Sequence, residues 1–350
     1  MIKDWKKKRR FRQALASTLQ KIFCKPERQP PYTGPLESIA ILAQEKYGDA
    51  ILLTPLLKNL KQCIPSCSIH LITFSKAIAS FFQNDPNVTA VHYAKGNVIR
   101  YTCKTLAPKF DLLFNTKDHP STNFLLQSIL IRARCKVGIA NEFHTGLFDY
   151  LVDTDFHTHI VRKNCGLLTI LGLKIAEESC RPYIPPMSVS EEIEMFAASL
   201  EPKMASGINI SAGGPTRYWT EENWSEIIAA FPVHRFVIFS TPTDIDQKRR
   251  LEDRHQNVIA SPGTANLLET GRIVKQIGLL ISPDTAMIHV ASCYNVPVIA
   301  LYGQATQDQK RFGPFFIKNK MVISPTAKVQ DIAVSSVANA FKEFMKDITS

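Results

Sequence analysis

The fold is decided by the stretch Ile281-Ser282-Pro283-Asp284-Thr285-Ala286-Met287-Ile288-His289-Val290-Ala291-Ser292-Cys293. An apolar run at 277–281 predicts a buried strand, which Pro283 would end. An acidic residue and a hydroxyl residue follow, and apolar residues at helical spacing then predict a helix. A second apolar strand is expected at 297–301, just before Gly303. The order strand, loop, helix, strand predicts one unit of a parallel sheet.

Asp284 and Thr285 occupy the place in this unit where parallel sheets bind ligands. Ligands lie at the carboxyl ends of the strands, and the N-terminus of a helix attracts phosphate. Both residue types also favour the cap position of a helix. From this stretch alone, capping and ligand binding are equally open interpretations.

The length and composition favour two folded domains. The chain has 350 residues, of which 45% are hydrophobic. No apolar run approaches the length that crosses a bilayer, and the N-terminus lacks the apolar core and cleavage site of a secretory signal. The eight cysteines show no spacing typical of a zinc or redox site, so we expect unpaired thiols in a reducing cytosol.

The net charge of +11 is concentrated at the N-terminus, where residues 1–28 contain ten basic and two acidic side chains. Residues 1–25 predict a basic amphipathic helix, and its apolar side is formed by Trp5, Phe11, Leu15, Leu19, Ile22 and Phe23. We expect this helix to bind an anionic membrane surface weakly and in a salt-sensitive way. A solvated tail or a helix docked on the body is the alternative. The body is near neutral, so no nucleic-acid partner is expected.

Strands and helices alternate twice along the chain, which predicts an α/β fold with two Rossmann-like halves. Residues 1–35 would form the N-terminal extension and linker, and residues 36–180 the first domain. One helix is expected at 50–63, between strands at 38–43 and 69–74. A proline-rich connector at 181–186 leads to the second domain at 187–330. Residues 331–350 would form a C-terminal helix that could pack back on the N-terminal domain.

A second polar loop suits a diphosphate. It lies in the segment Asn209-Ile210-Ser211-Ala212-Gly213-Gly214-Pro215-Thr216-Arg217-Tyr218-Trp219-Thr220. Gly213 and its neighbour permit close approach of an anion to the backbone. Ser211 and Thr216 add hydroxyl groups, and Arg217 adds a permanent cation. An ordinary turn with a surface arginine is the alternative.

Three segments together resemble the bacterial heptosyltransferases, glycosyltransferase family 9, which build the inner core of lipopolysaccharide. The segments are Gly48-Asp49 with Thr54-Pro55-Leu56-Leu57, Thr216-Arg217-Tyr218-Trp219 with Trp224, and Asp284-Thr285-Ala286-Met287-Ile288-His289-Val290-Ala291 with Pro297-Val298 and Gly303. They occur in the family's order and span about 38 to 303, which is most of the chain.

The resemblance implies a GT-B fold, in which two Rossmann-like domains face a central cleft, and an inverting sugar transfer without a metal. In the family, the acid of the Gly-Asp pair is the general base, which here is Asp49. A carboxylate between a strand and a helix can take the proton of an acceptor hydroxyl as that hydroxyl attacks the anomeric carbon. The alternative role for Asp49 is to cap its helix.

The resemblance also implies a donor site in the second domain. Arg217 stands where the family usually has lysine. It would contact the donor diphosphate through a planar guanidinium instead of an ammonium group, and at a different distance from the backbone. Asp284 and Thr285 would hold sugar hydroxyls and phosphate. Ala286 replaces the family's usual glycine and narrows the approach to the backbone. His289 matches a family histidine, and a helix histidine bonded to a neighbouring loop is its alternative.

The nucleotide itself is expected beside the loop that contains Gly263 and Thr264, with Asp244 reaching the ribose. Two Asp-x-Asp triplets, at 153–155 and 244–246, have no further ligands nearby in the sequence. Helix dipoles and cations can hold a diphosphate without a metal. We therefore expect no metal and no cofactor, with ADP-heptose as a co-substrate and activity that EDTA leaves unchanged.

The leading hypothesis is heptose transfer from ADP-heptose to a lipid A–Kdo or core oligosaccharide acceptor of lipopolysaccharide or lipooligosaccharide. The enzyme would be cytoplasmic and peripheral on the cytosolic face of the inner membrane. One alternative is another nucleotide-sugar for another surface glycan, and a second is a non-catalytic nucleotide-sugar-binding protein. A dinucleotide oxidoreductase is disfavoured because no Gly-x-Gly-x-x-Gly follows the first strand.

Overall fold

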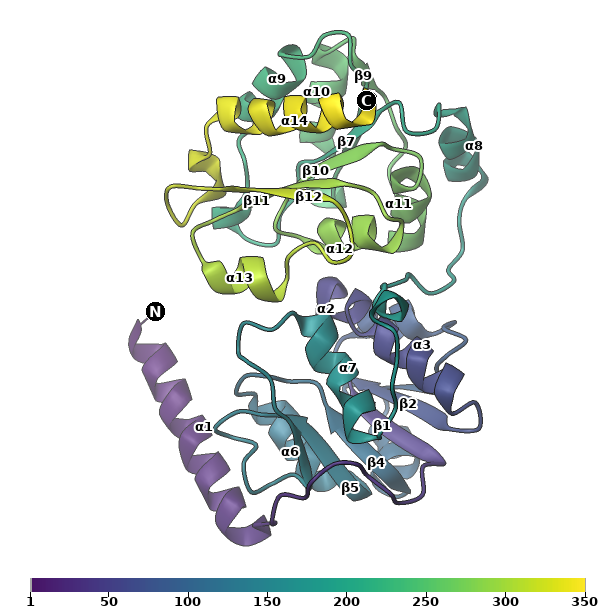
Figure 1. The fold of residues 1–350 in the computed structure, drawn as a ribbon, viewed down its shortest axis with the longest axis vertical. Helices are drawn as coiled ribbons and strands as arrows, with labels where there is room; N and C mark the ends of the chain where they lie inside the picture. The colour runs from purple at the N-terminus through teal and green to yellow at the C-terminus, as the bar shows by residue number, and fades with distance from the viewer. Residues whose placement is uncertain (1, 350) are drawn as a thin grey trace. The chain divides into compact units, whose positions relative to one another are not determined.

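The computed structural model describes the backbone of residues 2–349 and the side chains of residues 9–346. The chain divides into two compact units, Met1–Cys180 and Arg181–Ser350 (Figure 1). Each unit has its own six-stranded sheet, and helices are packed against it. The alternation of strands and helices in the sequence therefore predicted the class of both halves correctly.

The sheet of the N-terminal unit is parallel throughout, with the order β3-β2-β1-β4-β5-β6. Its strands are β1 (Ser38–Leu42), β2 (Ser68–Thr73), β3 (Ala90–Tyr93), β4 (Lys109–Asn115), β5 (Arg132–Ile139) and β6 (Tyr150–Val152). The direction of winding reverses between β1 and β4, where Leu42 pairs with Asn115. Open parallel sheets bind ligands at such a switch point.

The helices of this unit pack against the apolar faces of the sheet. Ala40 and Leu42 of β1 pack in one cluster with Tyr101 of α5 (Val98–Tyr101) and Phe124 of α6 (Thr122–Leu130). The alternate residues Ile39 and Ile41 are buried on the opposite face, as the period of a strand requires. The helices α3 (Thr54–Cys63) and α7 (Ile160–Ile170) pack on each other, and α4 (Lys76–Phe82) lies against β2 and β3. The sequence did not predict α4, α7 or β6.

The helix expected at 50–63 is two helices, α2 (Tyr47–Ile51) and α3. Pro55 lies in the first turn of α3, where its missing N–H costs nothing. The chain therefore begins a new helix at Thr54, and α2 is left as a short element of its own. This break places Asp49 inside α2 rather than ahead of a long helix.

The C-terminal unit repeats the topology of the first, with the sheet order β12-β11-β10-β7-β8-β9. Its strands are β7 (Ser206–Asn209), β8 (Phe236–Phe239), β9 (Val258–Ile259), β10 (Leu279–Pro283), β11 (Val298–Tyr302) and β12 (Asn319–Ile323). The main helices are α8 (Glu191–Ser199), α9 (Glu221–Ala229), α10 (Ile245–Arg254), α11 (Leu267–Val274), α12 (Ala286–Cys293), α13 (Thr306–Arg311) and α14 (Val334–Thr349). The strand–helix–strand unit predicted around Asp284 is confirmed as β10, α12 and β11.

The core of this unit contains two tryptophans and the last helix. Trp219 and Trp224 are buried edge to face, with ring centroids 4.7 Å apart. Phe341 and Phe344 of α14 belong to the same apolar cluster. The C-terminal helix therefore packs on the core of its own unit.

The basic helix α1 (Ile2–Phe23) docks on the N-terminal unit (Figure 1). Ala16 is buried in a cluster with Leu125 and Phe143. The side chain of Gln20 donates to the carbonyl oxygen of Thr145 over 2.8 Å. The docked helix was one of the alternatives left open by the sequence. Phe11 and Ile22 remain exposed, whereas the side chains of Lys3, Trp5, Lys6, Lys7 and Lys8 lie outside the described residues.

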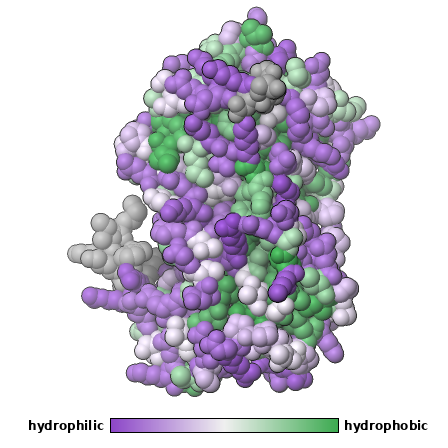
Figure 2. Space-filling model, viewed as in Figure 1, coloured by the Kyte–Doolittle hydropathy of each residue, from purple (hydrophilic) through white to green (hydrophobic). Residues whose placement is uncertain are grey.

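On the face drawn in Figure 2, hydrophilic side chains predominate and apolar ones form separate patches. Within residues 2–349, no helix combines the length and apolar character needed to pass through a bilayer. All eight cysteines are free thiols, as the sequence predicted.

Candidate active site

Asp49 lies beside the switch point of the N-terminal sheet, in the first turn of α2, which follows β1. The cap of α2 is Lys46, and no side chain makes a cap hydrogen bond there. Asp49 is therefore not the capping residue, and the alternative role considered for it is wrong. Its half-buried carboxylate is free to serve chemistry at this edge of the sheet.

The charge environment of Asp49 suits a proton acceptor. Burial raises the pKa of the Asp49 carboxyl, because the ionised form loses hydration. The positive charge of Lys117 opposes this shift most strongly among the neighbouring charges, followed by Lys46 and His119, whereas Asp118 adds to it. A carboxylate with a raised pKa takes a proton more readily than an exposed one.

The loop after β4 contains Lys117, whose charge acts on Asp49. The ammonium of Lys117 donates to the side-chain oxygen of Gln44 over 2.7 Å. The amide of Gln44 donates in turn to the carbonyl of Thr116 over 3.2 Å, and the Thr116 hydroxyl donates to the carbonyl of Leu42 over 2.6 Å. These contacts join the ends of β1 and β4, so the position of Lys117 is set by the sheet itself.

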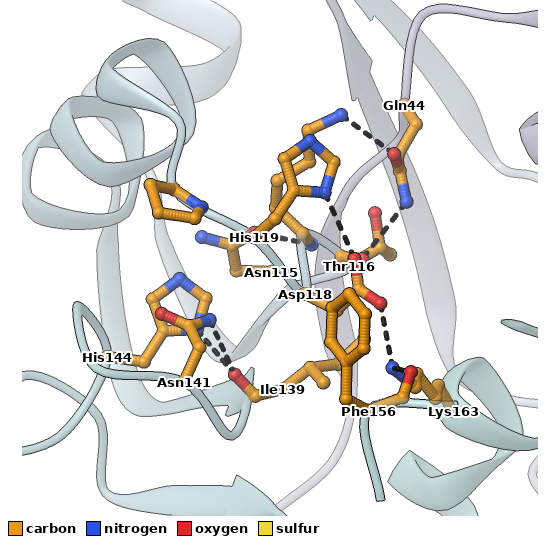
Figure 3. A network of polar contacts seen from close by, with 12 residues as sticks. Gln44, Asn115, Thr116, Asp118, His119, Ile139, Asn141, His144, Phe156 and Lys163 are labelled. Carbon is orange, nitrogen blue, oxygen red and sulfur yellow. Dashed lines mark hydrogen bonds and ion pairs between the residues drawn. The ribbon is translucent and has the colours of Figure 1, made fainter. Parts of the chain in front are cut away.

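A buried ion pair fixes the next residue of the loop. The Lys163 ammonium of α7 lies 2.8 Å from a carboxylate oxygen of Asp118, and the two residues are only 1% and 4% exposed. The same ammonium donates to the carbonyl of Phe156, and the other carboxylate oxygen of Asp118 lies 3.1 Å from Nδ1 of His119 (Figure 3). The loop 115–119 is thus rigid on both sides of Lys117.

Sequence reasoning missed this loop, although a signal was present. The polar run Asn115-Thr116-Lys117-Asp118-His119 follows the apolar strand β4 directly. Polar residues immediately after a buried parallel strand are candidates for a ligand site. None of the three segments that resemble the family includes this run.

Replacing Lys163 by Met should lower the free energy of unfolding by about 3–5 kcal/mol, because the Asp118 carboxylate would stay buried without its cation. Chemical denaturation of the purified variant measures this loss. The matched control is Lys320→Met, which breaks an exposed ion pair with Glu343 and should cost about 1 kcal/mol or less. Equal stability of the two variants would contradict the structural role of the buried pair.

The C-terminal unit brings the carboxyl ends of β7 and β10 together. The amide of Asn209 donates to the hydroxyl oxygens of Ser282 and Thr285 over 3.0 and 3.1 Å. Thr285 is the cap of α12, since its hydroxyl accepts from the backbone N–H of Met287. The capping interpretation therefore holds for Thr285. Ala286 is the first residue of the helix and is partly exposed.

Arg217 and Asp284 form the main charged pair of this unit's site. A guanidinium nitrogen of Arg217 lies 3.0 Å from an Asp284 carboxylate oxygen, and it also donates to the Asp284 carbonyl over 3.3 Å. The other terminal nitrogen lies 3.9 Å from Asp308. Asp284 thus orients Arg217 rather than capping α12. Asp308, on α13, is a neighbour of the cation that the sequence did not predict.

Asp244 closes a second polar cluster at the ends of β7 and β8. One of its carboxylate oxygens accepts from the hydroxyls of Ser211, Thr241 and Tyr218, over 2.5, 3.0 and 3.2 Å. The structure therefore brings the predicted residues Ser211 and Asp244 together. Because three hydroxyls already bind that oxygen, a ribose hydroxyl would have to donate to the other carboxylate oxygen of Asp244.

Three glycines leave open space at this edge of the sheet. A Cβ atom added to Gly213, Gly214 or Gly263 would meet nothing within 4 Å. Thr216 is exposed on the short turn Pro215–Arg217. Close approach of an anion to this backbone is therefore sterically free.

A shallow pocket adjoins the loop predicted to meet the nucleotide. Its lining includes Ser240, Lys248, Gly263 and Thr264. The Thr264 hydroxyl lies 2.8 Å from that of Thr270, which holds the loop against α11. His289, in contrast, is buried on α12.

Within the described residues, no group of three or more His, Cys, Asp or Glu side chains is arranged to hold a metal ion. Asp155, of the first triplet, accepts a hydrogen bond from the backbone N–H of His157. Asp244, of the second, accepts from the hydroxyls described above. Both triplets thus have local structural contacts.

Two Rossmann-like domains, each with polar side chains at the carboxyl ends of its central strands, are the architecture of the GT-B fold. The family model of "Glycosyltransferase family 9 (heptosyltransferase)" matches residues 99–339. The chain belongs to this family and is a glycosyltransferase.

Relatives and solved structures agree with this assignment. Lipopolysaccharide heptosyltransferase 3 of Escherichia coli is 24% identical over 73% of this chain and 81% of its own length. The lipopolysaccharide core heptosyltransferase OpsX of Haemophilus influenzae is 19% identical over 91% and 90%. The fold is similar to that of a family 9 glycosyltransferase from Veillonella parvula, with a TM-score of 0.69, 18% identity and coverage of 89% and 97%. It is also similar to that of E. coli heptosyltransferase WaaC with ADP, with a TM-score of 0.66, 15% identity and coverage of 88% and 98%.

Proposed function

We propose that this chain transfers heptose from ADP-heptose to an inner-core acceptor of lipopolysaccharide or lipooligosaccharide. The observation that carries the proposal is Asp49, a half-buried carboxylate of raised pKa at the switch point of the N-terminal sheet. The names of the curated relatives support lipopolysaccharide as the acceptor class. The ADP in the E. coli WaaC structure supports the nucleotide.

The proposed reaction is a single displacement. An acceptor hydroxyl oxygen attacks the anomeric carbon of the sugar, the bond from that carbon to the diphosphate breaks, and the hydroxyl proton passes to Asp49. Attack opposite to the leaving group inverts the anomeric centre. Arg217, oriented by Asp284, would stabilise the negative charge that develops on the departing ADP.

The donor chemistry needs no metal in this proposal and no cofactor beyond the nucleotide-sugar. The guanidinium of Arg217 has further donors besides the one bonded to Asp284, and they suit a diphosphate. The backbone around Gly213 offers space for the same anion. The acceptor would be reached at the cytosolic face of the inner membrane, with the enzyme bound peripherally.

The deciding experiment incubates purified protein with ADP-heptose and lipid A–Kdo acceptors, with and without EDTA, and measures product mass. Growth of the acceptor by one heptose in both conditions supports the proposal. Loss of activity with EDTA would overturn the metal-free mechanism. Turnover of UDP-sugars alone would indicate another surface glycan, and binding without turnover would indicate a non-catalytic protein.

Replacing Lys117 by Gln should move the acidic limb of the activity profile to higher pH, since the neighbouring cation lowers the pKa of Asp49. A general base works when ionised, so activity falls as the pH drops through the pKa of Asp49. At pH values on and below the limb, the variant should therefore be less active than the native enzyme.

The matched control for this variant is Lys46→Gln, which removes an exposed cation whose effect solvent screens. It should shift the limb much less. Equal shifts in both variants, or none in either, would contradict the coupling between Lys117 and Asp49.

A further inference from the structure

An exposed apolar pair projects from the N-terminal unit just after β3. Val98 and Ile99, at the start of α5, are 73% and 76% exposed. Asn97 caps the helix by accepting from the backbone N–H of Arg100, so the pair is held by a defined turn. Tyr101 is buried in the core and fastens α5 to the sheet. The apolar pair is thus a fixed structural feature of the surface.

The segment of the chain around this pair is basic. Residues 86–110 contain the basic side chains Lys95, Arg100, Lys104 and Lys109 and no acidic one. All four are exposed. We name Lys95, Val98, Ile99, Arg100 and Lys104 the α5 surface.

The charges of the α5 surface act on a common neighbour. Arg100 and Lys104 both lower the pKa of His92 on β3, in addition to the larger effect of burial, which brings it to about 4. His92 is itself stacked on His70, with Nδ1 of His70 3.0 Å from Nε2 of His92. Arg100 directly follows the apolar pair in α5, and Lys104 lies on the next helical segment, Thr102–Leu106.

The α5 surface follows the carboxyl end of β3, and Asp49 follows the carboxyl end of β1. All strands of the sheet are parallel, so both lie at the same edge of the unit. A surface that held this edge against a bilayer would bring a lipid-anchored acceptor toward Asp49. This consequence rests on the proposed function.

We propose that the α5 surface docks on an anionic lipid bilayer, with Val98 and Ile99 entering the interface and the cations meeting lipid phosphates. Apolar side chains ringed by Lys and Arg bind such surfaces through burial and charge together. A protein partner would need a complementary acidic surface, whereas an anionic bilayer supplies charge complementarity over any area. The docked helix α1 is a separate basic element, since part of its apolar side is already covered by Leu125 and Phe143.

The test is co-sedimentation of the full chain with large vesicles of phosphatidylglycerol and phosphatidylethanolamine, or of phosphatidylcholine alone. The native chain should bind the anionic vesicles and lose binding as salt rises. The double variant Val98→Ser with Ile99→Ser, and the double variant Arg100→Gln with Lys104→Gln, should each bind at least fivefold more weakly. All of these side chains are exposed, so the fold should be retained, which the melting temperature verifies.

Matched controls are Val233→Ser, which removes a valine that is 93% exposed in the other unit, and Arg249→Gln, which removes an exposed cation there. Both should bind like the native chain. Native-like binding by both α5 double variants, or no vesicle binding by the native chain, would overturn the proposal. Loss of binding only in Phe11→Ser with Ile22→Ser would also overturn it and assign the membrane contact to α1.

This experiment contains no donor and no acceptor, so it is independent of catalysis. Vesicle binding through the α5 surface without heptose transfer would refute the proposed function and leave the membrane contact standing. Heptose transfer without vesicle binding would do the reverse.

Discussion

Replacing Asp49 by Asn is expected to reduce sugar transfer by about 10²–10⁴-fold, because the amide cannot accept the acceptor's proton. The change keeps the size and shape of the side chain. Asp49 forms no cap of α2, so the helix should keep its conformation. Donor binding should persist, since the residues proposed for it belong to the C-terminal unit.

The measurements are initial rates with ADP-heptose, the melting temperature, and ADP binding by calorimetry. The matched control is Glu45→Gln, which removes an exposed carboxylate from the same loop and should leave the rate within about twofold of native. Near-native turnover by Asp49→Asn would remove Asp49 from the role of base. Unchanged ADP binding together with lost transfer would locate the defect in the chemical step.

The second large effect is expected for Arg217→Gln, which should weaken ADP-heptose binding roughly 10- to 100-fold. A charge-assisted hydrogen bond contributes about 1.5–3 kcal/mol, and the variant would lose at least one such bond to the diphosphate. It would also leave the carboxylate of Asp284 without the cation that lies 3.0 Å away. Calorimetric titration with ADP measures the loss.

Two further variants separate charge from geometry. Arg217→Lys keeps the positive charge but loses the planar guanidinium with its paired N–H donors. Its affinity for ADP should therefore lie between those of the native enzyme and the glutamine variant. Arg250→Gln removes an arginine that pairs with Glu221 on the surface of the same unit, and ADP binding should be unchanged. Equal ADP affinity in native enzyme and Arg217→Gln would exclude Arg217 from the donor site.

The sequence was most informative where local patterns and the fold agree. The apolar runs at β1, β8, β10 and β11 are buried on both faces, so composition alone located these strands. The loops at Ser211, Arg217 and Asp284 follow such strands directly, and the structure brings Arg217 and Asp284 into contact. Arg217 and Asp284 are 67 residues apart in the sequence. They meet because the carboxyl ends of parallel strands lie at the same edge of the sheet.

The sequence was least informative for elements and side chains whose role depends on residues far away in the sequence. The short strand β6 and the helix α7 lack a clear period, and Lys163 on α7 resembles any surface lysine until Asp118 is placed beside it. Lys117 became a candidate neighbour of Asp49 only when the pairing of β1 with β4 was known. The division of 50–63 into two helices depends on Pro55, whose position in a first turn could have been recognised.

The indole N–H of Trp219 donates to the carbonyl oxygen of Ile332 over 3.0 Å, two residues before α14 begins. Trp219 is also only two residues after Arg217, so the tail of the chain is fastened to the turn that presents the guanidinium. Under the proposed function, deletions or bulky fusions at the C-terminus should therefore weaken nucleotide binding by displacing Arg217. Purification handles for this enzyme are therefore better placed elsewhere. Under the same proposal, natural variation near residue 332 would change donor affinity without replacing Arg217 or Asp284.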